Sequence, residues 1–186
     1  MSRFLNSKYK DFVSVDLETT GLSFETDRII QIAAVKVVNG EIIDIYKNLI
    51  NPKKHIPIEA SRINGIYDSD IRNAETIDKI LPEFKEFIGN NPLVMHNENF
   101  DLSFLKAESI RVYNDNIIKN KHICTLQLWK TQFKEKQGVY PPSSKLSTLV
   151  ENLLSKEEIK DYYSNQHTAS GDAIATAKVF MKLFGK

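Results

Sequence analysis

The dipeptide Asn39-Gly40 is the sequence feature that most constrains the fold, because it stands between two long apolar segments. Asn-Gly favours the positive φ angles of a tight two-residue turn, and residues 28–38 and 41–50 on either side are rich in isoleucine and valine. This pattern predicts a β-hairpin. Residues 12–18, with the sequence FVSVDLE, predict a further strand that ends at a Thr-Thr-Gly turn. The chain is therefore expected to build an antiparallel three-stranded unit first.

After the hairpin, segments of helical and strand character alternate, which favours a mixed sheet with helices on its faces. Residues 92–97 and 121–126 predict strands, and residues 51–66 predict a loop that leads into a short helical stretch. Helical spacing of apolar residues begins at Thr76, where Pro82 predicts a kink or a late helix start. The polar, proline-broken segment 134–145 predicts a mobile loop. Further helices are expected over residues 100–110, 126–133, 146–154 and 174–184.

Composition limits the possible function classes. The chain has 186 residues, 41% of them hydrophobic, and lacks a Pro/Ser/Gly-rich linker, so a single domain over residues 1–186 is expected. Twenty-five basic and 24 acidic residues give a net charge of +1, which argues against a protein that binds nucleic acid through bulk positive charge. A single cysteine, Cys124, and no apolar run long enough for secretion or a bilayer predict a cytoplasmic protein without membrane association.

Asp16 and Glu18 lie at the end of the first predicted strand, one residue apart. Side chains on a strand repeat with period two, so both carboxylates are expected on the same face. Two such groups brought close together repel each other unless one takes up a proton or a cation lies between them. The alternative is a solvated strand end with both groups in water.

A second acidic position follows the strand at 92–97, in the segment HNENFDLSFL. Asp101 falls in the first turn of the next predicted helix, where the helix dipole alone would favour it. Junctions between strands and helices also line functional crevices in α/β sheets. His96, at the end of the strand, is either a ligand-facing group or a structural hydrogen-bonding histidine.

A third position lies near the end of the chain, in the segment HTASGDA. His167 and Asp172 are five residues apart, so they can face one site only if His167 lies at or before the start of the helix. Ser170 and Gly171 favour such an irregular opening. A surface histidine and a helix-start acid are the alternatives.

In this order, VDLETTGL, HNENFD and H-x-x-x-x-D resemble the three motifs of the DEDDh 3′→5′ exonuclease superfamily. Within it the chain is most similar to the epsilon proofreading subunit of bacterial DNA polymerase III and to related polymerase exonuclease domains. The resemblance extends from about Phe12 to Leu183, and it includes DRIIQIAAVKVVNGEI and INPKKHIPIEASRINGI between the motifs.

The resemblance implies an α/β ribonuclease H-like fold, with a five-stranded mixed sheet whose second strand is antiparallel and with helices on its faces. It implies that Asp16, Glu18, Asp101 and Asp172 bind two divalent cations, Mg²⁺ or Mn²⁺, which suit hard oxygen ligands. A two-metal hydrolysis of terminal phosphodiesters would follow, with His167 as the general base and nucleoside 5′-monophosphates as products.

The resemblance also implies a pocket for the terminal nucleotide. Leu22 would wedge against bases, and Phe100 could stack on any base without reading its edge. The alternative interpretation is that Phe100 and Leu22 are ordinary core residues. The residues that match positions lining this pocket are Thr19, Gly21, Leu22, Ile63, Asn64, His96 and Phe100.

Three features depart from the family pattern. Ser170 stands where many relatives carry a bulky residue, which affects the expected placement of His167. Asn64 replaces a threonine or histidine in the nucleotide pocket. The sequence ends at Lys186, without the tail by which the epsilon subunit is tethered to its polymerase, so a free-standing exonuclease or a fragment is favoured over a firmly bound polymerase partner.

The leading hypothesis is a metal-dependent 3′→5′ exonuclease that acts on single-stranded or frayed DNA ends in proofreading or repair. One alternative is the same chemistry on RNA or very short oligonucleotides, because nothing in the sequence identifies a contact to the 2′-hydroxyl. The other is a non-catalytic nucleic-acid-binding module, which would have no chemical need for all five catalytic groups.

Overall fold

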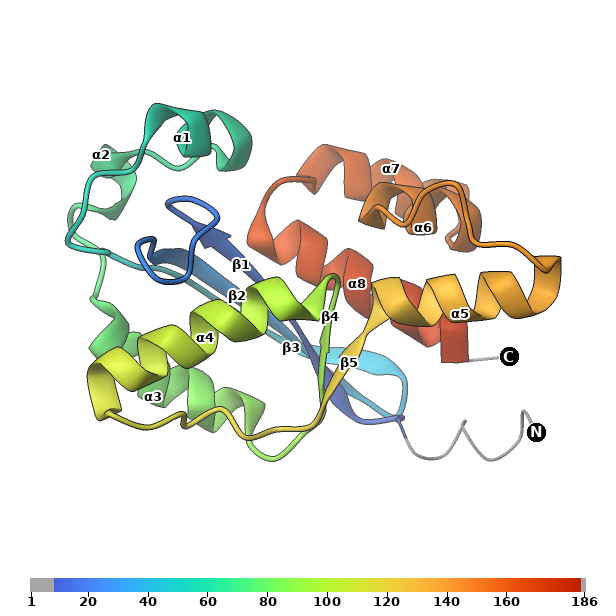
Figure 1. The fold of residues 1–186 in the computed structure, drawn as a ribbon, viewed down its shortest axis with the longest axis horizontal. Coiled ribbons are helices and arrows are strands. Elements are labelled where there is room, and N and C mark those ends of the chain that lie inside the picture. The colour runs from blue at the N-terminus through green and yellow to red at the C-terminus, as the bar shows by residue number, and fades with distance from the viewer. Residues whose placement is uncertain (1–8, 185–186) are drawn as a thin grey trace.

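The computed structural model describes residues 9–184, and these form one mixed sheet with helices on both faces (Figure 1). The expectations for the first residues and for the end at Lys186 lie outside the described part. The strands are β1 (Phe12–Thr19), β2 (Ile29–Val38), β3 (Glu41–Leu49), β4 (Leu93–Met95) and β5 (His122–Cys124). The helices are α1 (Ile58–Asn64), α2 (Asp68–Ile71), α3 (Ile77–Ile88), α4 (Glu98–Tyr113), α5 (Thr125–Gln137), α6 (Leu146–Leu153), α7 (Lys156–Asn165) and α8 (Ala169–Phe184).

The sheet confirms the expected topology. Its strand order is β3-β2-β1-β4-β5, in which β2 is antiparallel to β1 and β3, whereas β4 runs parallel to β1 and β5. Asn39 and Gly40 turn the β2–β3 hairpin with φ angles of 53° and 81°, as a tight Asn-Gly turn requires. The predicted hairpin and both later strands are therefore present.

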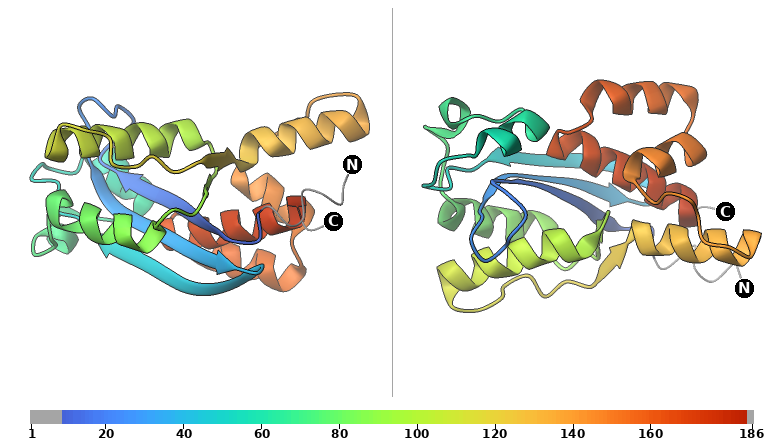
Figure 2. Two further views of the ribbon diagram at one scale, coloured as in Figure 1. Left: turned by 90° about the horizontal axis from the view of Figure 1, so that it is seen from below. Right: turned by 45° about the horizontal axis from the view of Figure 1, so that its top comes forward.

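Alternation along β1 divides the core between the two faces of the sheet. Val13, Val15 and Leu17 are buried in a cluster with α3 and α4, through residues such as Phe84 and Phe104. Phe12 is on the other face, in the cluster that includes Ala173 and Phe180 of α8. Figure 2 shows α3 and α4 on one side of the sheet and α8 on the other, while α5, α6 and α7 supply a third cluster around α8.

Three local predictions need correction. The helix α3 begins at Ile77 and continues through Pro82, so the late start was wrong. Pro82 is the sixth residue of this helix, where a proline loses one backbone hydrogen bond and its ring crowds the carbonyl of Asp78. The burial of Ile80, Leu81, Phe84 and Ile88 offsets that cost. The helix α5 extends to Gln137, so residues 134–137 are not part of a loop, and Gly138 ends the helix in the left-handed conformation. The helix α7 was not predicted.

Among residues 9–184, the structure has no helix that is both long enough and apolar enough to cross a bilayer.

Candidate active site

The strand β1 presents Asp16 and Glu18 on the face that α8 covers. Its alternate residues Val13, Val15 and Leu17 are committed to the core on the other face, so the polar positions must point toward α8. Ser14 shows the contact directly, because its hydroxyl donates to the Ala173 carbonyl of α8 over 2.8 Å. The two acidic side chains follow this serine along the strand and are both only half-buried.

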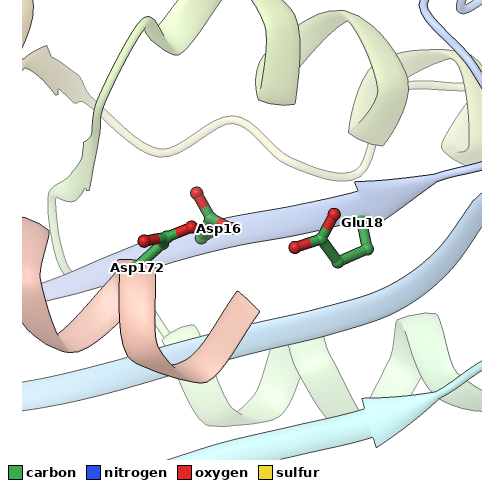
Figure 3. Close-up of side chains that lie close together, drawn as sticks. All are labelled: Asp16, Glu18 and Asp172. Atoms are coloured by element: carbon green, nitrogen blue, oxygen red, sulfur yellow. The ribbon is translucent and has the colours of Figure 1, made fainter. Parts of the chain in front are cut away.

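The first turn of α8 brings Asp172 to the same place (Figure 3). The Thr168 hydroxyl accepts from the Gly171 amide over 3.1 Å and so caps the helix. The Ala169 amide donates to the Gln31 side chain of β2 over 3.3 Å, which fixes the helix start against the sheet. One carboxylate oxygen from each of Asp16, Glu18 and Asp172 lies within 4.8 Å of the other two.

Asp101 joins this cluster from the opposite side of the sheet, and its side chain is buried. The strand β4 pairs with β1 only at Val13 and Ser14, so the backbone of β1 beyond that point has no strand on this side. The first turn of α4 occupies the space, and the backbone of Leu17 hydrogen-bonds to the Asp101 carboxylate. The short β4 strand is what allows a helix on one face to reach carboxylates on the other.

Burial raises the proton affinity of all four carboxyl groups, and repulsion between them adds to it at Asp16, Glu18 and Asp101. Burial, together with the charges of Asp101, Asp172 and Glu18, raises the pKa of Asp16 well above its ordinary value. Burial and Asp172 raise the pKa of Glu18 to about 8. Burial also raises the pKa of Asp101, against the backbone hydrogen bonds it receives, and that of Asp172, against the influence of His167.

The donor set fits hard divalent cations. Among the described residues, no lysine or arginine forms an ion pair with any of the four carboxylates. The buried Oδ1 atom of Asp172 also lacks a hydrogen-bond partner there. Carboxylate oxygens with no cationic side chain beside them are the ligands that Mg²⁺ and Mn²⁺ prefer. The arrangement can therefore hold such ions, with Asp16, Glu18 and Asp172 around a common point.

His167 lies two residues before α8, in an exposed position and with a left-handed φ of 61°. His167 can face the same site as Asp172 only if it lies at or before the start of the helix. Its position before α8 meets this condition. Its influence lowers the pKa of Asp172. Tyr162 of α7 is buried beside the same carboxylate, and burial together with Asp172 raises the pKa of the phenol, which therefore stays protonated.

Leu22 of the β1–β2 loop and Ile63 of α1 form an exposed rim near the end of β1, the strand that carries Asp16 and Glu18. Leu22 is 85% exposed and Ile63 is 68% exposed, so neither belongs to the core. Asn64 is buried, and its side chain donates to the Thr19 carbonyl over 3.4 Å, which joins the end of α1 to the end of β1. A Cβ atom at Gly21 would lie 2.4 Å from the Asp27 carboxylate, so a larger residue there would displace that side chain.

His96 and Phe100 have structural contacts that limit what they could offer a ligand. The two ring nitrogens of His96 bond to the Thr125 hydroxyl over 2.9 Å and to the Ser144 carbonyl over 3.0 Å. Burial lowers the pKa of His96 to about 4, so its ring is neutral. Phe100 is half-buried against Phe104, with ring centroids 5.0 Å apart, and leaves part of its ring accessible.

The sequence reasoning missed three residues that build the site. Thr168 directly precedes the last helix, and its type alone indicates a cap. Tyr162 lies on the unpredicted helix α7, although Ser155 and Glu158 form a capping box, which is a recognisable start signal. Gln31 stands opposite Glu18 in the β1–β2 ladder, and no local pattern marks it.

Comparison with known proteins identifies the family of the chain. A family described as "Exonuclease" matches residues 13–180. The chain is 32% identical over 176 residues to the DNA polymerase III subunit epsilon of Aquifex aeolicus, with 92% of this chain and 79% of that protein covered. It is 35% identical over 176 residues to the PolC-type DNA polymerase III of Clostridium perfringens, covering 95% of this chain. The chain spans only 11% of the length of that polymerase.

Two solved structures share the fold. A zinc-bound E. coli ExoI–ssDNA complex superposes with a TM-score of 0.77 at 20% identity, covering 96% of this chain and 42% of that one. Exonuclease X in complex with 5′ overhanging duplex DNA gives a TM-score of 0.67 at 22% identity, covering 94% and 91%. The fold is thus the ribonuclease H-like α/β fold of these nucleases.

Proposed function

The chain belongs to the exonuclease family, and on that premise we propose that it is a metal-dependent 3′→5′ exonuclease that acts on DNA. The observation that carries this proposal is the cluster of Asp16, Glu18 and Asp172, whose carboxylate oxygens lie within 4.8 Å of one another. Asp101 enters the same cluster from the other face of the sheet and completes a set of four acids.

The four carboxylates would hold two divalent cations, Mg²⁺ or Mn²⁺. When bound, such ions polarise a phosphodiester and make water a stronger nucleophile at neutral pH. The repulsion that raises the pKa values of Asp16 and Glu18 would be relieved at the same time, because cations would replace the protons that the carboxylates otherwise retain.

His167 would act as the general base. Its exposed position before α8 leaves the ring free to reach substrate from solvent, and a neutral imidazole can accept the proton of an attacking water. The water oxygen would bond to the terminal phosphorus while the bond from phosphorus to the 3′ oxygen of the preceding nucleotide breaks. A nucleoside 5′-monophosphate leaves, and the 3′ oxygen of the preceding nucleotide takes up a proton from solvent to become a 3′-hydroxyl.

The exposed rim would receive the 3′ end. Leu22 and Ile63 present apolar surface near the end of β1, which suits contact with bases, and the accessible part of Phe100 could stack on one. The backbone of Thr19 would lie near the terminal sugar, and Gly21, which has no side chain, would leave room for it. Asn64 would stabilise the rim through its hydrogen bond to the Thr19 carbonyl. For His96, whose ring nitrogens are both engaged, we propose at most a contact through the ring face.

A substrate assay tests this proposal. Single-stranded DNA labelled at its 5′ end should shorten stepwise with Mg²⁺ or Mn²⁺, and the same strand labelled at its 3′ end should release labelled mononucleotide first. Chelator should stop both reactions. Products that shorten from the 5′ end, or activity that persists in chelator, would overturn the proposal. A matched RNA strand decides sugar preference, and faster cleavage of RNA would replace DNA as the substrate.

We also propose a proofreading or repair role, which the names of the polymerase relatives support. A site for a single strand should accept a frayed 3′ end more readily than a paired one. Primer–templates that differ only in a terminal mismatch test this role, with faster release of the mismatched nucleotide as the expected result. Equal rates on the two substrates would contradict it.

A further inference from the structure

The loop between β1 and β2, residues 20–28, carries Leu22 away from the core, yet it is firmly bonded at its base. The Thr20 amide donates to the Arg28 carbonyl over 2.9 Å, which closes the loop. Inside it, the Asp27 carboxylate accepts from the Thr20 hydroxyl over 2.9 Å and from the Ser23 amide over 3.1 Å. These bonds order the base of the loop, but they do not fix it relative to the rest of the molecule.

Two segments attach the loop to the rest of the molecule. Lys54, before α1, donates to the Thr26 carbonyl over 2.9 Å and to the Asp27 carboxylate over 3.1 Å, and the helix α4 contacts the outer turn. The Arg111 guanidinium donates to the Phe24 carbonyl, and to the Glu25 carbonyl over 2.9 Å, both at the outer turn of the loop. The same guanidinium contacts Glu108, one turn earlier on α4, with an Nη1–Oε1 distance of 3.0 Å. Arg28, at the end of the loop, approaches the same Oε1 atom to 3.9 Å. One carboxylate therefore lies between two arginines that hold the loop.

Glu108 is the unusual member of this group, because its side chain is only 2% exposed. A buried ion pair adds little stability over an apolar residue of similar size. The pair instead fixes a geometry, because the Arg28 and Arg111 side chains are both directed at the Glu108 carboxylate. Arg28 also donates to the Asp27 carbonyl over 2.8 Å, so its orientation bears on the loop as well.

The same helix carries Asp101 of the acidic cluster. Asp101 and Glu108 are seven residues apart, which is about 10 Å along a helix and nearly the same face. Both are buried against the sheet. A rigid helix therefore connects the carboxylates of the candidate metal site with the attachment of the Leu22 loop.

We propose that Glu108 is a positioning residue, which acts through Arg111 and Arg28 to hold the Leu22 loop at a fixed distance from the acidic cluster. This inference rests on the proposed function, in which the loop receives the 3′ end of a strand. Glu108 does not touch the substrate. Its effect is on substrates long enough to press a second base against Leu22.

Two substrates separate this role from a general structural one. A single-stranded oligonucleotide presents two bases to the loop, whereas the p-nitrophenyl ester of thymidine 5′-monophosphate presents one base and the same kind of phosphodiester. In Glu108→Gln, the ratio of kcat/KM for the oligonucleotide to kcat/KM for the ester should fall about tenfold, because a small misplacement costs of that order. The loss should appear mainly as a higher KM for the oligonucleotide.

A second variant guards against misfolding of the first. Arg111→Lys keeps a positive charge near Glu108 but cannot reach that carboxylate and two carbonyls together. It should lower the same ratio of kcat/KM values. In the double variant Glu108→Gln with Arg111→Lys the ratio should be no lower than in either single variant, since both substitutions act through one contact. The matched control is Asp115→Asn, because Asp115 forms an exposed ion pair with Lys119 beyond the end of α4 and should leave the ratio unchanged.

An unchanged ratio in both Glu108→Gln and Arg111→Lys would overturn the inference. Hydrogen exchange gives a readout that does not depend on activity: amides of residues 20–28 should exchange faster in both variants than in Asp115→Asn. Equal exchange in all three proteins would also count against it. If the wild-type protein cleaves neither substrate with Mg²⁺ or Mn²⁺, the proposed function fails instead, and exchange alone decides whether Glu108 holds the loop.

Discussion

Burial raises the pKa of carboxylates in two places of this molecule, but the charges around the two groups differ. Around Glu108 the chain provides its own positive charges, Arg28 and Arg111. Around Asp16, Glu18 and Asp172 it provides no lysine or arginine partner among the described residues. His167 acts on Asp172 alone, and the like charges raise the pKa values of Asp16 and Glu18 further. A carboxylate balanced by arginine is suited to holding structure, whereas a set that remains unbalanced is suited to binding a cation from solution.

The largest expected effect concerns the rate of the proposed reaction. Asp16→Asn removes a charged ligand but keeps the size of the side chain, so kcat for oligonucleotide hydrolysis should fall about 10³-fold or more, the equivalent of several kcal/mol of charge stabilisation. Circular dichroism should show an unchanged fold. Residual activity within tenfold of wild type would remove the acidic cluster from the reaction.

Metal and pH should act together on thermal stability. The pKa of Glu18 is raised to about 8 from an ordinary value near 4.5, so the folded state binds this proton more tightly than the unfolded state. Its contribution to stability is complete below pH 4.5 and is lost as pH rises through about 8. In chelator, the acidic cluster should therefore make Tm lower at pH 8 than at pH 5.5.

Saturating Mn²⁺ should reverse that trend. Metal at about 100 times its Kd stabilises a protein by about 2.7 kcal/mol, or several degrees in Tm at this size. The gain should be larger at pH 8 than at pH 5.5, because protons compete with metal for the carboxylates. Differential scanning calorimetry measures it, and an equal gain at both pH values would contradict the raised proton affinities.

Neutralising one carboxylate in each group should have opposite effects on stability. In chelator at pH 8, Asp16→Asn should raise the free energy of unfolding by about 1 kcal/mol because it removes repulsion. Glu108→Gln should lower it by about 1–3 kcal/mol because two arginines lose their partner. Urea unfolding at one pH compares the variants directly. Shifts of the same sign would mean that the two environments do not differ as described.

The smallest effect is expected at the exposed pair between Asp115 and Lys119, whose side chains are 65% and 70% exposed. Solvent screens such pairs, so Asp115→Asn should leave Tm and the urea midpoint within experimental reproducibility. Burial, rather than pairing alone, then explains the behaviour of Glu108. A Tm loss at Asp115 as large as that at Glu108 would defeat this explanation.

The sequence alone predicted what local chemistry determines. Asn39-Gly40 identified the hairpin, and the period of β1 placed Asp16 and Glu18 on one face. The capping box at Ser155 and Glu158 would have predicted α7 as well. The late start considered for α3 was wrong because the influence of Pro82 was taken from propensity, whereas tertiary burial determines where that helix begins.

Other features depend on contacts between distant segments. His96 bonds to a carbonyl 48 residues later in the chain, so the sequence could not decide between a ligand-facing and a structural histidine. In sequence, Glu108 resembles an ordinary helical acid. Only the approach of Arg28, 80 residues earlier, and the loop contacts of Arg111 distinguish it. The role of each site residue remains a proposal that the variants above can test.

The central claim is that the unbalanced carboxylates form a cation site on which cleavage depends. Titration of the metal-free protein with Mn²⁺, monitored by isothermal titration calorimetry, tests it most directly. The account predicts binding of two ions by the wild-type chain, lost or strongly weakened in Asp16→Asn and retained in Glu108→Gln. Absence of binding at millimolar Mn²⁺, or equal binding by wild type and Asp16→Asn, would contradict it.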